Sequence, residues 1–498
     1  MKGSLIGIDA GSTNVKVCAF RRDGTVIARA SRPVEIAAPR PRWAEINLED
    51  YWLAMRSALD EVLQTAGAPD GVGIACTAPT TIMMDQHGRA LRPGIPFLDN
   101  RGAGELEAVA RAVGGADAFF ARTGNRLSPS TASVVTLRWL MREEPEIWHK
   151  TAYVGFLNSY LAARLTGVVG ADRTQASYTG LFRLNQAADW DADLAAAMGV
   201  PVDRLAPLVQ SYEMIGRVTA AAAAETGLPA GTPVALGSAD TAAAAFALGV
   251  REGGESFESA GTSGVITFCL DRPDFDDAFM NRCHVVPGRW LAHGAMSTPG
   301  AALDWLREQV WPDLGSHGEL ERLAAGSEPG ARGLVFLPYL AGERSPIWDA
   351  AASGAWVGLR LDTRREDMAR AVFEGTAYGL RQILERGVRR WGSRPEQLLC
   401  VGGGVRSRLW TQIKADILNV AYQIAELPDA AALGAALMGG LAAGVYTGVQ
   451  DPELPRSCAV SDVVKPGPAE RRVRYEKPFS VYESLYPMLR DAMHRLAL

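Results

Sequence analysis

The sequence is poor in the features that mark secreted, membrane and metal-binding proteins. Its 498 residues include six cysteines with no CxxC pair among them, so neither a disulfide framework nor a zinc site is indicated. No apolar run approaches the roughly 18 to 20 residues of a membrane span, and the N-terminus turns polar too early for a signal peptide. We therefore expect a cytoplasmic protein that does not contact a membrane.

An excess of positive charge is also missing. Lys and Arg together number 51 against 56 Asp and Glu, which gives a formal net charge of −5. A nucleic-acid surface would need clustered basic residues, so no nucleic-acid partner is expected. The composition, 48% hydrophobic and 21% charged, is typical of folded globular proteins. A chain of this length exceeds one ordinary core and should divide into two or three domains.

Short β-type runs alternate with helical ones along the chain, which indicates an α/β protein. Residues 4–11 (SLIGIDAG) predict a strand, and residues 15–34 predict two more, joined at a turn at Asp23-Gly24. Residues 48–67 follow as an amphipathic helix. The same order recurs later in the runs 254–270, 291–310 and 397–420. This recurrence predicts two similar halves that face one another.

The stretch GIDAGSTNVK, residues 7–16, has chemistry suited to phosphate. A strand brings Asp9 to a turn of small residues whose N–H and hydroxyl groups can approach phosphate oxygens. A carboxylate at this position also suits Mg²⁺, which prefers oxygen ligands. The residues that could form the phosphate cradle are Gly11, Ser12, Thr13 and Lys16. The alternative is an ordinary turn with an Asp cap, and the sequence lacks a Walker A pattern.

Two further glycine turns lie in the second half of the chain. SAGTSG, residues 259–264, repeats the phosphate-turn chemistry with Gly261 and Thr262, without the acidic residue. CVGGGVRSRLW, residues 400–410, places three glycines between a strand and a helix, where backbone could approach a ligand. Close packing of that helix on the strand is the alternative. Two phosphate-type turns in separate halves suggest a polyphosphate held between two domains.

A long segment in the second half carries a family resemblance. GAWVGLRLDTRREDMARAVFEG, residues 354–375, is similar to the C-terminal signature of the FGGY carbohydrate kinases. Segments such as GIDAGSTNVKV, GSADTAAAAF, SAGTSGV and FLPYLAGERSP follow in family order across nearly the whole chain. The resemblance implies an α/β fold of two actin-like (ribonuclease H-like) ATPase domains with an interdomain cleft.

The same resemblance implies the domain limits and the cofactors. Residues 1–246 would form the sugar-binding domain with the catalytic Asp, and residues 247–498 the nucleotide-binding domain. The last helix is expected to pack back on the body. ATP and Mg²⁺ are the expected cofactors, with Asp9 as the metal-holding residue. The expected nucleotide-binding residues of the second domain are Gly300, Gly403, Gly404 and Ser407.

In the family, an Asp in a Gly-x-x-Asp turn is the general base for the sugar hydroxyl. The matching turn is Gly237-Ser238-Ala239-Asp240, which makes Asp240 the expected base. Phosphoryl transfer asks a protein mainly for positioning and charge neutralisation, so one carboxylate near the nucleophile is consistent with that role. Glu374 of the signature is expected to be structural, and Arg344 is expected in a loop salt bridge.

The chain departs from the family at the expected acceptor loop. Glycerol kinases have an Arg-Glu pair there and xylulose kinases a Met-His pair, whereas this chain has Ala78-Pro79. The residue after the expected base is Thr241, where the family has Gln or Asn. Among the polar candidates Thr80, Asp99, Arg101 and Thr131, we expect Asp99 to bind a substrate hydroxyl; a solvated loop acid is the alternative. The expected substrate-binding residues are Ala78, Pro79, Asp99, Thr131, Asp240 and Thr241.

The sequence thus predicts an ATP-dependent kinase that phosphorylates a hydroxyl of a sugar or polyol, with a ketose such as a pentulose as the leading acceptor. A polyol or a sugar acid is the alternative acceptor. The alternative from another class is a non-catalytic ATP- or sugar-binding regulatory protein, which the presence of Asp240 and both phosphate turns disfavours. The expected partners are the small-molecule acceptor and a second copy of the chain in a homodimer.

Overall fold

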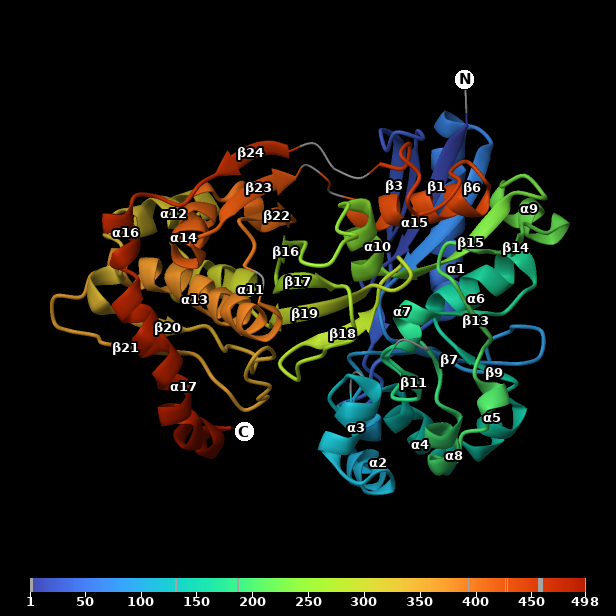
Figure 1. The fold of residues 1–498 in the computed structure, drawn as a ribbon, viewed down its shortest axis with the longest axis horizontal. Coiled ribbons are helices and arrows are strands. Elements are labelled where there is room, and N and C mark those ends of the chain that lie inside the picture. The colour runs from blue at the N-terminus through green and yellow to red at the C-terminus, as the bar shows by residue number, and fades with distance from the viewer. Residues whose placement is uncertain are drawn as a thin grey trace.

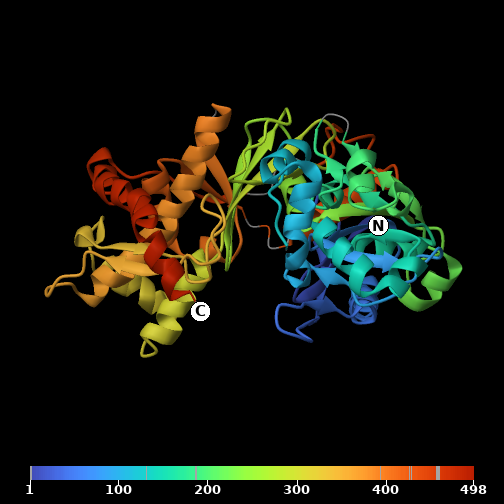
Figure 2. The same ribbon diagram turned by 90° about the horizontal axis from the view of Figure 1, so that it is seen from below.

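The computed structural model describes residues 3–129, 132–185, 188–392, 394–425, 427, 429–455 and 460–497. Figure 1 shows two α/β bodies side by side, the first built mainly from the N-terminal half and the second mainly from the C-terminal half. Seen from below, in Figure 2, the bodies stand apart over much of their height and meet near the middle of the molecule. Each body contains one large sheet.

The first sheet has the strand order β14-β15-β6-β1-β2-β3. Strands β15, β6 and β1 run parallel, and β1, β2 and β3 form an antiparallel meander. Their bounds are β1 Ser4–Ala10, β2 Asn14–Phe20, β3 Val26–Pro33, β6 Pro69–Cys76, β14 Met214–Arg217 and β15 Pro233–Ala239. The strands and the hairpin predicted for residues 4–34 are confirmed.

The second sheet repeats this plan in the order β18-β19-β17-β16-β22-β23-β24. Strand β16 pairs in parallel with β22 and antiparallel with β17, as β1 does with β6 and β2. The bounds are β16 Ser256–Ala260, β17 Gly264–Leu270, β18 Met280–Cys283, β19 Trp290–Met296, β22 Gln397–Val401, β23 Ala421–Ala425 and β24 Val460–Val464. The predicted recurrence of one strand order in both halves is confirmed.

Helices cover the outer face of each sheet. Helix α1 (Leu48–Ala66) begins after Asn47, whose side chain accepts a hydrogen bond from the Glu49 N–H, and ends at Gly67. With α6 (Leu157–Thr166) it packs over the first sheet. Helices α13 (Arg365–Trp391), α14 (Arg408–Leu418) and α17 (Glu476–Leu496) belong to the core of the second body. The last helix therefore packs back on the body, as predicted.

Two alanine-rich helices fill the space between the sheets. Helix α10 (Asp240–Ala247) and helix α15 (Ala430–Ala442) share one hydrophobic core with residues of both sheets, among them Leu5, Ala75 and Leu291. Helix α15 lies against the first sheet, because a Cβ on Gly7 would come within 1.7 Å of the Ala432 carbonyl oxygen. Helix α15 lies between strands β23 and β24 of the second sheet in sequence, yet it packs on the first sheet. The domain division predicted at 246/247 stays a prediction.

Smaller elements extend the first body below its sheet (Figure 1). They include β7 Thr80–Met84, β9 Tyr153–Gly155, α2 Leu106–Val113, α3 Ala116–Thr123, α4 Ser133–Glu143, α5 Pro145–Lys150, α7 Arg173–Ala176 and α8 Ala192–Ala197. Helix α9 (Ala220–Thr226) lies beside the first sheet. The second body adds α11 Pro299–Trp305, α12 His317–Ala325, β20 Val335–Leu337, β21 Ala355–Val357 and α16 Ala469–Val473. None of the described helices is long and apolar enough to cross a membrane.

Candidate active site

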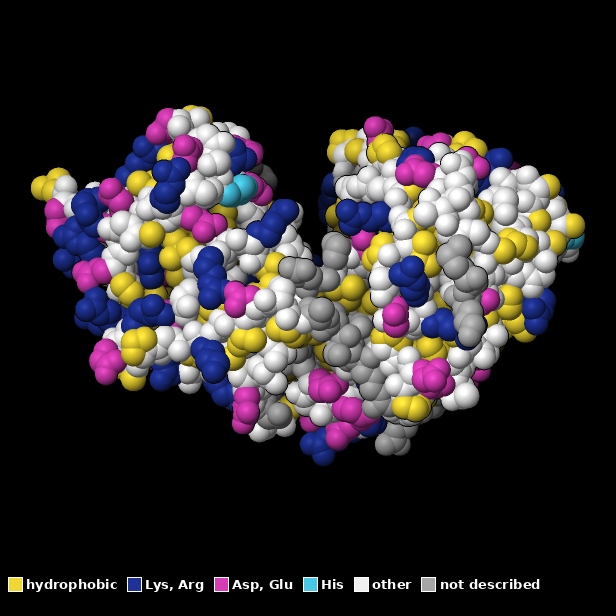
Figure 3. Space-filling model, turned by 90° about the horizontal axis from the view of Figure 1, so that it is seen from above, with side chains coloured by type: hydrophobic (Ala, Val, Ile, Leu, Met, Phe, Trp, Pro, Cys, Tyr) yellow, Lys and Arg dark blue, Asp and Glu magenta, His cyan; other side chains and the backbone are white. Residues whose placement is uncertain are grey.

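Figure 3 shows from above a hollow between the two bodies. The turn between β1 and β2 lines a cavity of the first body. Asp9 on β1 is paired directly with Lys16 on β2, and opposed residues of an antiparallel pair lie on the same face of the sheet. The turn is closed by a hydrogen bond of 3.0 Å from the Gly11 N–H to the Asn14 carbonyl. The hairpin thus brings the Asp9 carboxylate, the Lys16 ammonium and a tight turn together.

Asp240 reaches the same region through an irregularity in β15. The pairing of β15 with β6 shifts register between Ala235 and Ser238, and Gly237 in that interval has φ +83°. A Cβ on Gly237 would lie 1.5 Å from the Ile74 carbonyl oxygen, so only glycine fits there. The Ala239 N–H then donates to the Thr174 hydroxyl at 2.8 Å, which fixes the backbone just before Asp240.

One cavity of about 350 Å³ collects the residues predicted in the first domain for phosphate, for the metal and for the general base. Its lining includes Asp9, Gly11, Ser12, Thr13, Lys16, Asp240 and Thr241, together with Asn14, Thr77, Ala244 and Ala431. Ala431 belongs to α15, so a segment that lies between β23 and β24 of the second sheet in sequence completes the wall. Residues from four separate parts of the chain therefore meet in the space where the sequence predicts phosphate and metal.

The two carboxylates of this cavity are electrostatically coupled. Burial, and the nearby Asp240 carboxylate, raise the pKa of Asp9 to about 7, while Lys16 acts in the opposite direction. Burial also raises the pKa of Asp240, against the positive charge of Arg282 and a 2.6 Å hydrogen bond from the Thr241 N–H. A carboxylate whose pKa is raised accepts a proton more readily, which suits a general base.

Lys16 also has a neighbour from the far end of the chain. Its Nζ lies 3.8 Å from Oδ1 of Asp429, whose Oδ2 lies 3.7 Å from Nη1 of Arg29. Asp429 occupies the position just before α15 and is 8% exposed. The long distances and the exposure of both cations make these weak ion pairs, so Lys16 remains able to turn toward an anion in the cavity.

The glycine turns of the second body contact one another. The N–H of Gly300 donates to the Thr262 carbonyl at 3.1 Å, and a Cβ on Gly300 would lie 2.1 Å from the Gly261 carbonyl oxygen. Gly404 is packed against Ala260, where an added Cβ would meet the Ala260 Cβ at 3.1 Å. The predicted residues Gly261, Thr262, Gly300, Gly403 and Gly404 therefore belong to adjoining turns at one end of the second sheet.

Ser407 has a structural role in the present geometry. It is the N-cap of α14, and its Oγ accepts a hydrogen bond of 3.1 Å from the Trp410 N–H. N-capping satisfies a backbone donor that the helix leaves unpaired. The N-cap contact by itself explains why a serine occupies this position. The predicted contact of Ser407 with a nucleotide stays a prediction.

The contacts of Asp99 favour a different role from the one predicted for it. Asp99 is 2% exposed, and its carboxylate accepts from the Ala44 N–H, the Arg101 N–H and the Arg101 guanidinium. Arg101 in turn lies over the Trp43 ring, 3.9 Å from its centroid. Both Asp99 oxygens are therefore occupied inside the protein, and a buried ion pair explains this residue better than a substrate contact.

The other predicted acceptor residues give a mixed picture. Ala78 and Pro79 follow β6 directly and are joined by a cis peptide bond. The Gln175 amide lies against this loop and donates to Cys76 Sγ at 3.0 Å. Thr131 falls outside the described residues. Thr77, the residue before this pair, lines the cavity, but neither Ala78 nor Pro79 is among its lining residues. Their contact with the acceptor stays a prediction.

Sequence reasoning missed Thr174, Tyr178 and Arg282. Thr174 and Tyr178 lie about one helical turn apart, in and just after α7, and the Tyr178 hydroxyl accepts hydrogen bonds from Nε and Nη2 of Arg282 at 2.9 and 2.6 Å. Arg282 comes from β18 of the second body. The segment DRTQAS is part of the family resemblance, but no local pattern links Tyr178 to an arginine 104 positions away.

Glu374 has the structural role expected for it. It is fully buried, its Oε1 accepts from Arg370 Nε at 2.7 Å, and the same oxygen accepts from the Gly330 N–H. Burial raises the pKa of Glu374 to about 7. Arg344 donates to the Met296 carbonyl at 3.0 Å, and none of the described residues forms a salt bridge with it within 4.0 Å, so the predicted salt bridge is not found in the described structure.

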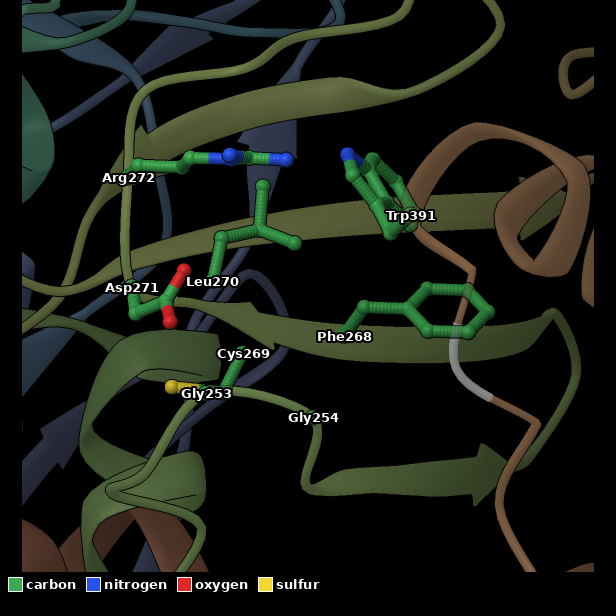
Figure 4. A pocket seen from close by; sticks show the side chains of 8 residues that line it. All are labelled: Gly253, Gly254, Phe268, Cys269, Leu270, Asp271, Arg272 and Trp391. Carbon is green, nitrogen blue, oxygen red and sulfur yellow. The ribbon is translucent and has the colours of Figure 1, made fainter.

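A second cavity lies away from this chemistry. It has a volume of about 550 Å³, and Figure 4 shows its lining: Gly253, Gly254, Phe268, Cys269, Leu270, Asp271, Arg272 and Trp391. These residues come from the far end of β17, its neighbouring loops and the end of α13. None of the residues predicted for ATP, metal or acceptor binding lines it.

The chain matches known proteins over nearly its full length. Residues 4–247 match the N-terminal domain of the FGGY family of carbohydrate kinases, and residues 257–443 match the C-terminal domain. The xylulose kinase of Escherichia coli is 30% identical over 98% of this chain and 99% of that protein. A gluconokinase of Bacillus subtilis is 26% identical over 98% of this chain and 95% of that protein.

Solved structures agree with these matches. The crystal structure of xylulose kinase from Rhodospirillum rubrum superposes with a TM-score of 0.89 and 32% identity, covering 99% of this chain and 100% of that one. The fold is therefore the two-domain actin-like ATPase fold that the sequence predicts, and the activity class is transfer of a phosphoryl group to an alcohol. This chain belongs to the FGGY family of carbohydrate kinases.

Proposed function

We propose that this protein transfers the γ-phosphoryl group of ATP to a hydroxyl of an open-chain sugar, with Asp240 as the general base. The observation that carries the proposal is that Asp9, the Gly11–Thr13 turn and Asp240 line one cavity. A phosphate cradle, a metal-holding acid and a proton acceptor are the parts that phosphoryl transfer to an alcohol requires.

In this proposal each part of the cavity has one task. The Asp240 carboxylate orients the acceptor hydroxyl and takes its proton as the oxygen attacks the γ-phosphorus. The backbone of Gly11, Ser12 and Thr13 and the Lys16 ammonium hold the phosphates from the first body, while Gly261 and Thr262 hold them from the second. Closure of the two bodies excludes water, which would otherwise compete as the acceptor.

The geometry fits Mg²⁺ beside the phosphates. Asp9 faces the cavity, and none of the described residues donates a hydrogen bond to its carboxylate. Mg²⁺ binds through one or two carboxylates, water and phosphate oxygens, so Asp9 would hold the ion. Bound Mg²⁺ supplies positive charge to the phosphate oxygens.

The acceptor is supported less directly than the reaction. A ketose such as a pentulose is the sequence prediction, and it agrees with the names of the xylulose kinases among the relatives. The gluconokinases extend the range of acceptors in similar proteins to a sugar acid. Both classes offer several hydroxyl groups to Asp240.

The deciding experiment is a coupled ADP-release assay with ketoses, polyols and sugar acids, run on the parent protein and on Asp240→Asn. We expect turnover of at least one acceptor by the parent and loss of most of it in the variant. Absence of turnover with every acceptor, in a protein that binds ATP, would instead favour the non-catalytic regulatory protein. Light scattering in the same buffer tests the predicted homodimer.

A further inference from the structure

Arg282 is a buried cation whose guanidinium contacts no carboxylate among the described residues. It is 4% exposed, and its guanidinium lies over the Tyr178 ring, 4.3 Å from the centroid. Two of its nitrogens, Nε and Nη2, donate to the uncharged Tyr178 hydroxyl. The third, Nη1, is buried without a hydrogen-bond partner among the described residues.

A buried guanidinium normally has a carboxylate beside it. Arg stays protonated in proteins, and burying an unpaired charge is costly. The buried arginines Arg101 and Arg370 follow that rule, with Asp99 and Glu374 as their partners. In the described part of the chain, no acidic group lies within 4.0 Å of Arg282. Its unused donor is therefore available to an anion that the protein itself does not provide.

The position of Arg282 is on the acceptor side of the cleft. Its partner Tyr178 lies one turn beyond Thr174, whose hydroxyl receives the N–H of the residue just before Asp240. Residues about four apart on a helical segment lie on the same face. The positive charge of Arg282 also acts on Asp240, whose pKa it lowers against the effect of burial. Arg282 and the expected base thus lie close enough to interact electrostatically.

The phosphate turn of the second body lies farther off. Arg282 is paired with Leu291 on β19, whereas Met296 of β19 is paired with Gly264, at the end of the SAGTSG turn. The five positions from Leu291 to Met296 span about 17 Å along a strand. Arg344 is the guanidinium at the Met296 end, where it donates to that residue's carbonyl. Arg282 is therefore better placed for the acceptor than for the phosphates of ATP.

We propose that Arg282 makes the acceptor pocket selective for a sugar acid. Nη1 of Arg282 donates to the carboxylate of the acceptor, while one of the acceptor's hydroxyls faces Asp240. The inference rests on the proposed kinase function and narrows its acceptor from sugars in general to those with a carboxylate. Tyr178 is the positioning residue, because its hydroxyl holds the other two guanidinium nitrogens.

The test compares acceptors that differ in charge. Initial rates would be measured with D-xylonate, D-gluconate and D-xylulose for the parent protein, Arg282→Gln and Arg282→Lys. We expect the parent to prefer an acid, and Arg282→Gln to lower kcat/KM for that acid by about 10- to 150-fold, the range for a hydrogen bond to a charged group. Arg282→Lys should recover part of the loss. The KM for ATP should change by less than about threefold, and kcat/KM for D-xylulose should fall by a smaller factor than kcat/KM for the acid.

The control variant is Arg272→Gln, which removes a cation from the same body at an exposed position of the second cavity. It should leave all three rates unchanged. If Arg282→Gln unfolds, Tyr178→Phe tests the same pocket by releasing the guanidinium, and it should reduce the rate with the acid selectively. A parent preference for D-xylulose would overturn the proposal. Equal losses of kcat/KM for the acid and for D-xylulose would also overturn it, because they would show that Arg282 acts on Asp240 or on the phosphates of ATP.

A binding measurement separates this inference from the kinase function. Calorimetry would follow D-xylonate and D-gluconate titrated into the parent protein and Arg282→Gln without ATP. Binding that is lost in the variant supports the role of Arg282 even if no acceptor is phosphorylated, an outcome that would reject the proposed function alone. Binding of equal strength in both proteins would overturn the role of Arg282 whatever the kinase assay gives.

Discussion

Asp9 on β1 and Asp240, the first residue of α10 directly after β15, face one cavity. Strands β1 and β15 lie on either side of β6. The three strands are parallel, so their carboxyl ends meet at the same edge of the sheet. The charge on Asp240 contributes to the raised pKa of Asp9. The protonation of one acid thus depends on another acid that is 231 positions away in sequence.

Replacing the expected base should stop turnover and spare nucleotide binding. Asp240→Asn keeps the size of the side chain and its hydrogen bond from the Thr241 N–H but cannot take a proton. We expect kcat to fall by about 10²- to 10⁴-fold, the usual contribution of a positioned base. Steady-state assays and ADP titration would measure the two effects. Undiminished turnover in this variant would remove Asp240 from the mechanism.

Asp9→Ala should affect Mg²⁺-dependent steps selectively. The substitution removes the carboxylate proposed to hold the ion but leaves the acceptor side of the cavity in place. We expect turnover to fall at least about 100-fold, with the dissociation constant of the acceptor changed by less than about threefold. Rates measured over a Mg²⁺ series, with calorimetry of the acceptor, provide the comparison. Equal losses in both measurements would show that Asp9 does not act through the metal.

Ionisation of Asp9 should lower the free energy of unfolding of the ligand-free protein as the pH rises. The folded pKa of about 7 lies above the ordinary value of 3.8 for an aspartate, so the folded state binds more protons than the unfolded state between these values. Stability from this group is therefore present at low pH and is lost as the pH rises through about 7. Asp9→Asn should raise Tm relative to the parent at pH 8, and the difference should shrink by pH 5. Melting curves without Mg²⁺ that show a constant difference would contradict this pKa.

Gly237→Ala should destabilise the protein and misplace the base. The added Cβ would meet the Ile74 carbonyl oxygen at 1.5 Å in a residue with φ +83°, so β15 must move away from β6. We expect a loss of more than about 2 kcal/mol in the free energy of unfolding, with lower kcat in the protein that folds. Gly231→Ala is the control, because Gly231 has φ +89° and open space around it. It should cost only the backbone strain, about 1 to 2 kcal/mol.

Glu374→Gln should reduce stability without changing the chemistry. It deprives the buried Arg370 of its carboxylate, and breaking a buried pair costs about 3 to 5 kcal/mol. Denaturant titration should show that loss, while kcat measured well below Tm stays within about twofold of the parent. Glu385→Gln on the same helix removes a partly exposed partner of Arg381 and should cost less than about 1 kcal/mol. A large loss of kcat in folded Glu374→Gln would give this residue a catalytic role.

Much of the site was predictable because its parts are local. The GIDAGST and SAGTSG turns each carry their own glycine and hydroxyl groups, so the residues that shape the turn are the ones expected to hold phosphate. Gly237 and Asp240 form a short motif in the same way. The cavity confirms that the first-domain residues of these motifs come together.

The acceptor side was harder to predict for a physical reason. Asp99 looks like a free polar residue in a loop, but the Ala44 N–H and the Arg101 guanidinium fill its oxygens. Arg282 lies in an ordinary strand. It is notable only because its guanidinium bonds to Tyr178 and to no acid among the described residues. Whether a charged side chain is paired depends on neighbours that are distant in sequence.

The sequence by itself determined the strands, the turns, the helix ends and the family, since each is encoded by residues close together along the chain. The tertiary structure decided where α15 packs, which cavity Asp9 and Asp240 share, and which charges remain without a partner. Alanine-rich α15 carries no polar face to direct it, and its place is set by close contact with Gly7 and Gly73 of the first sheet. Burial and pairing depend on separation in space, and the fold brings together groups that the sequence keeps apart.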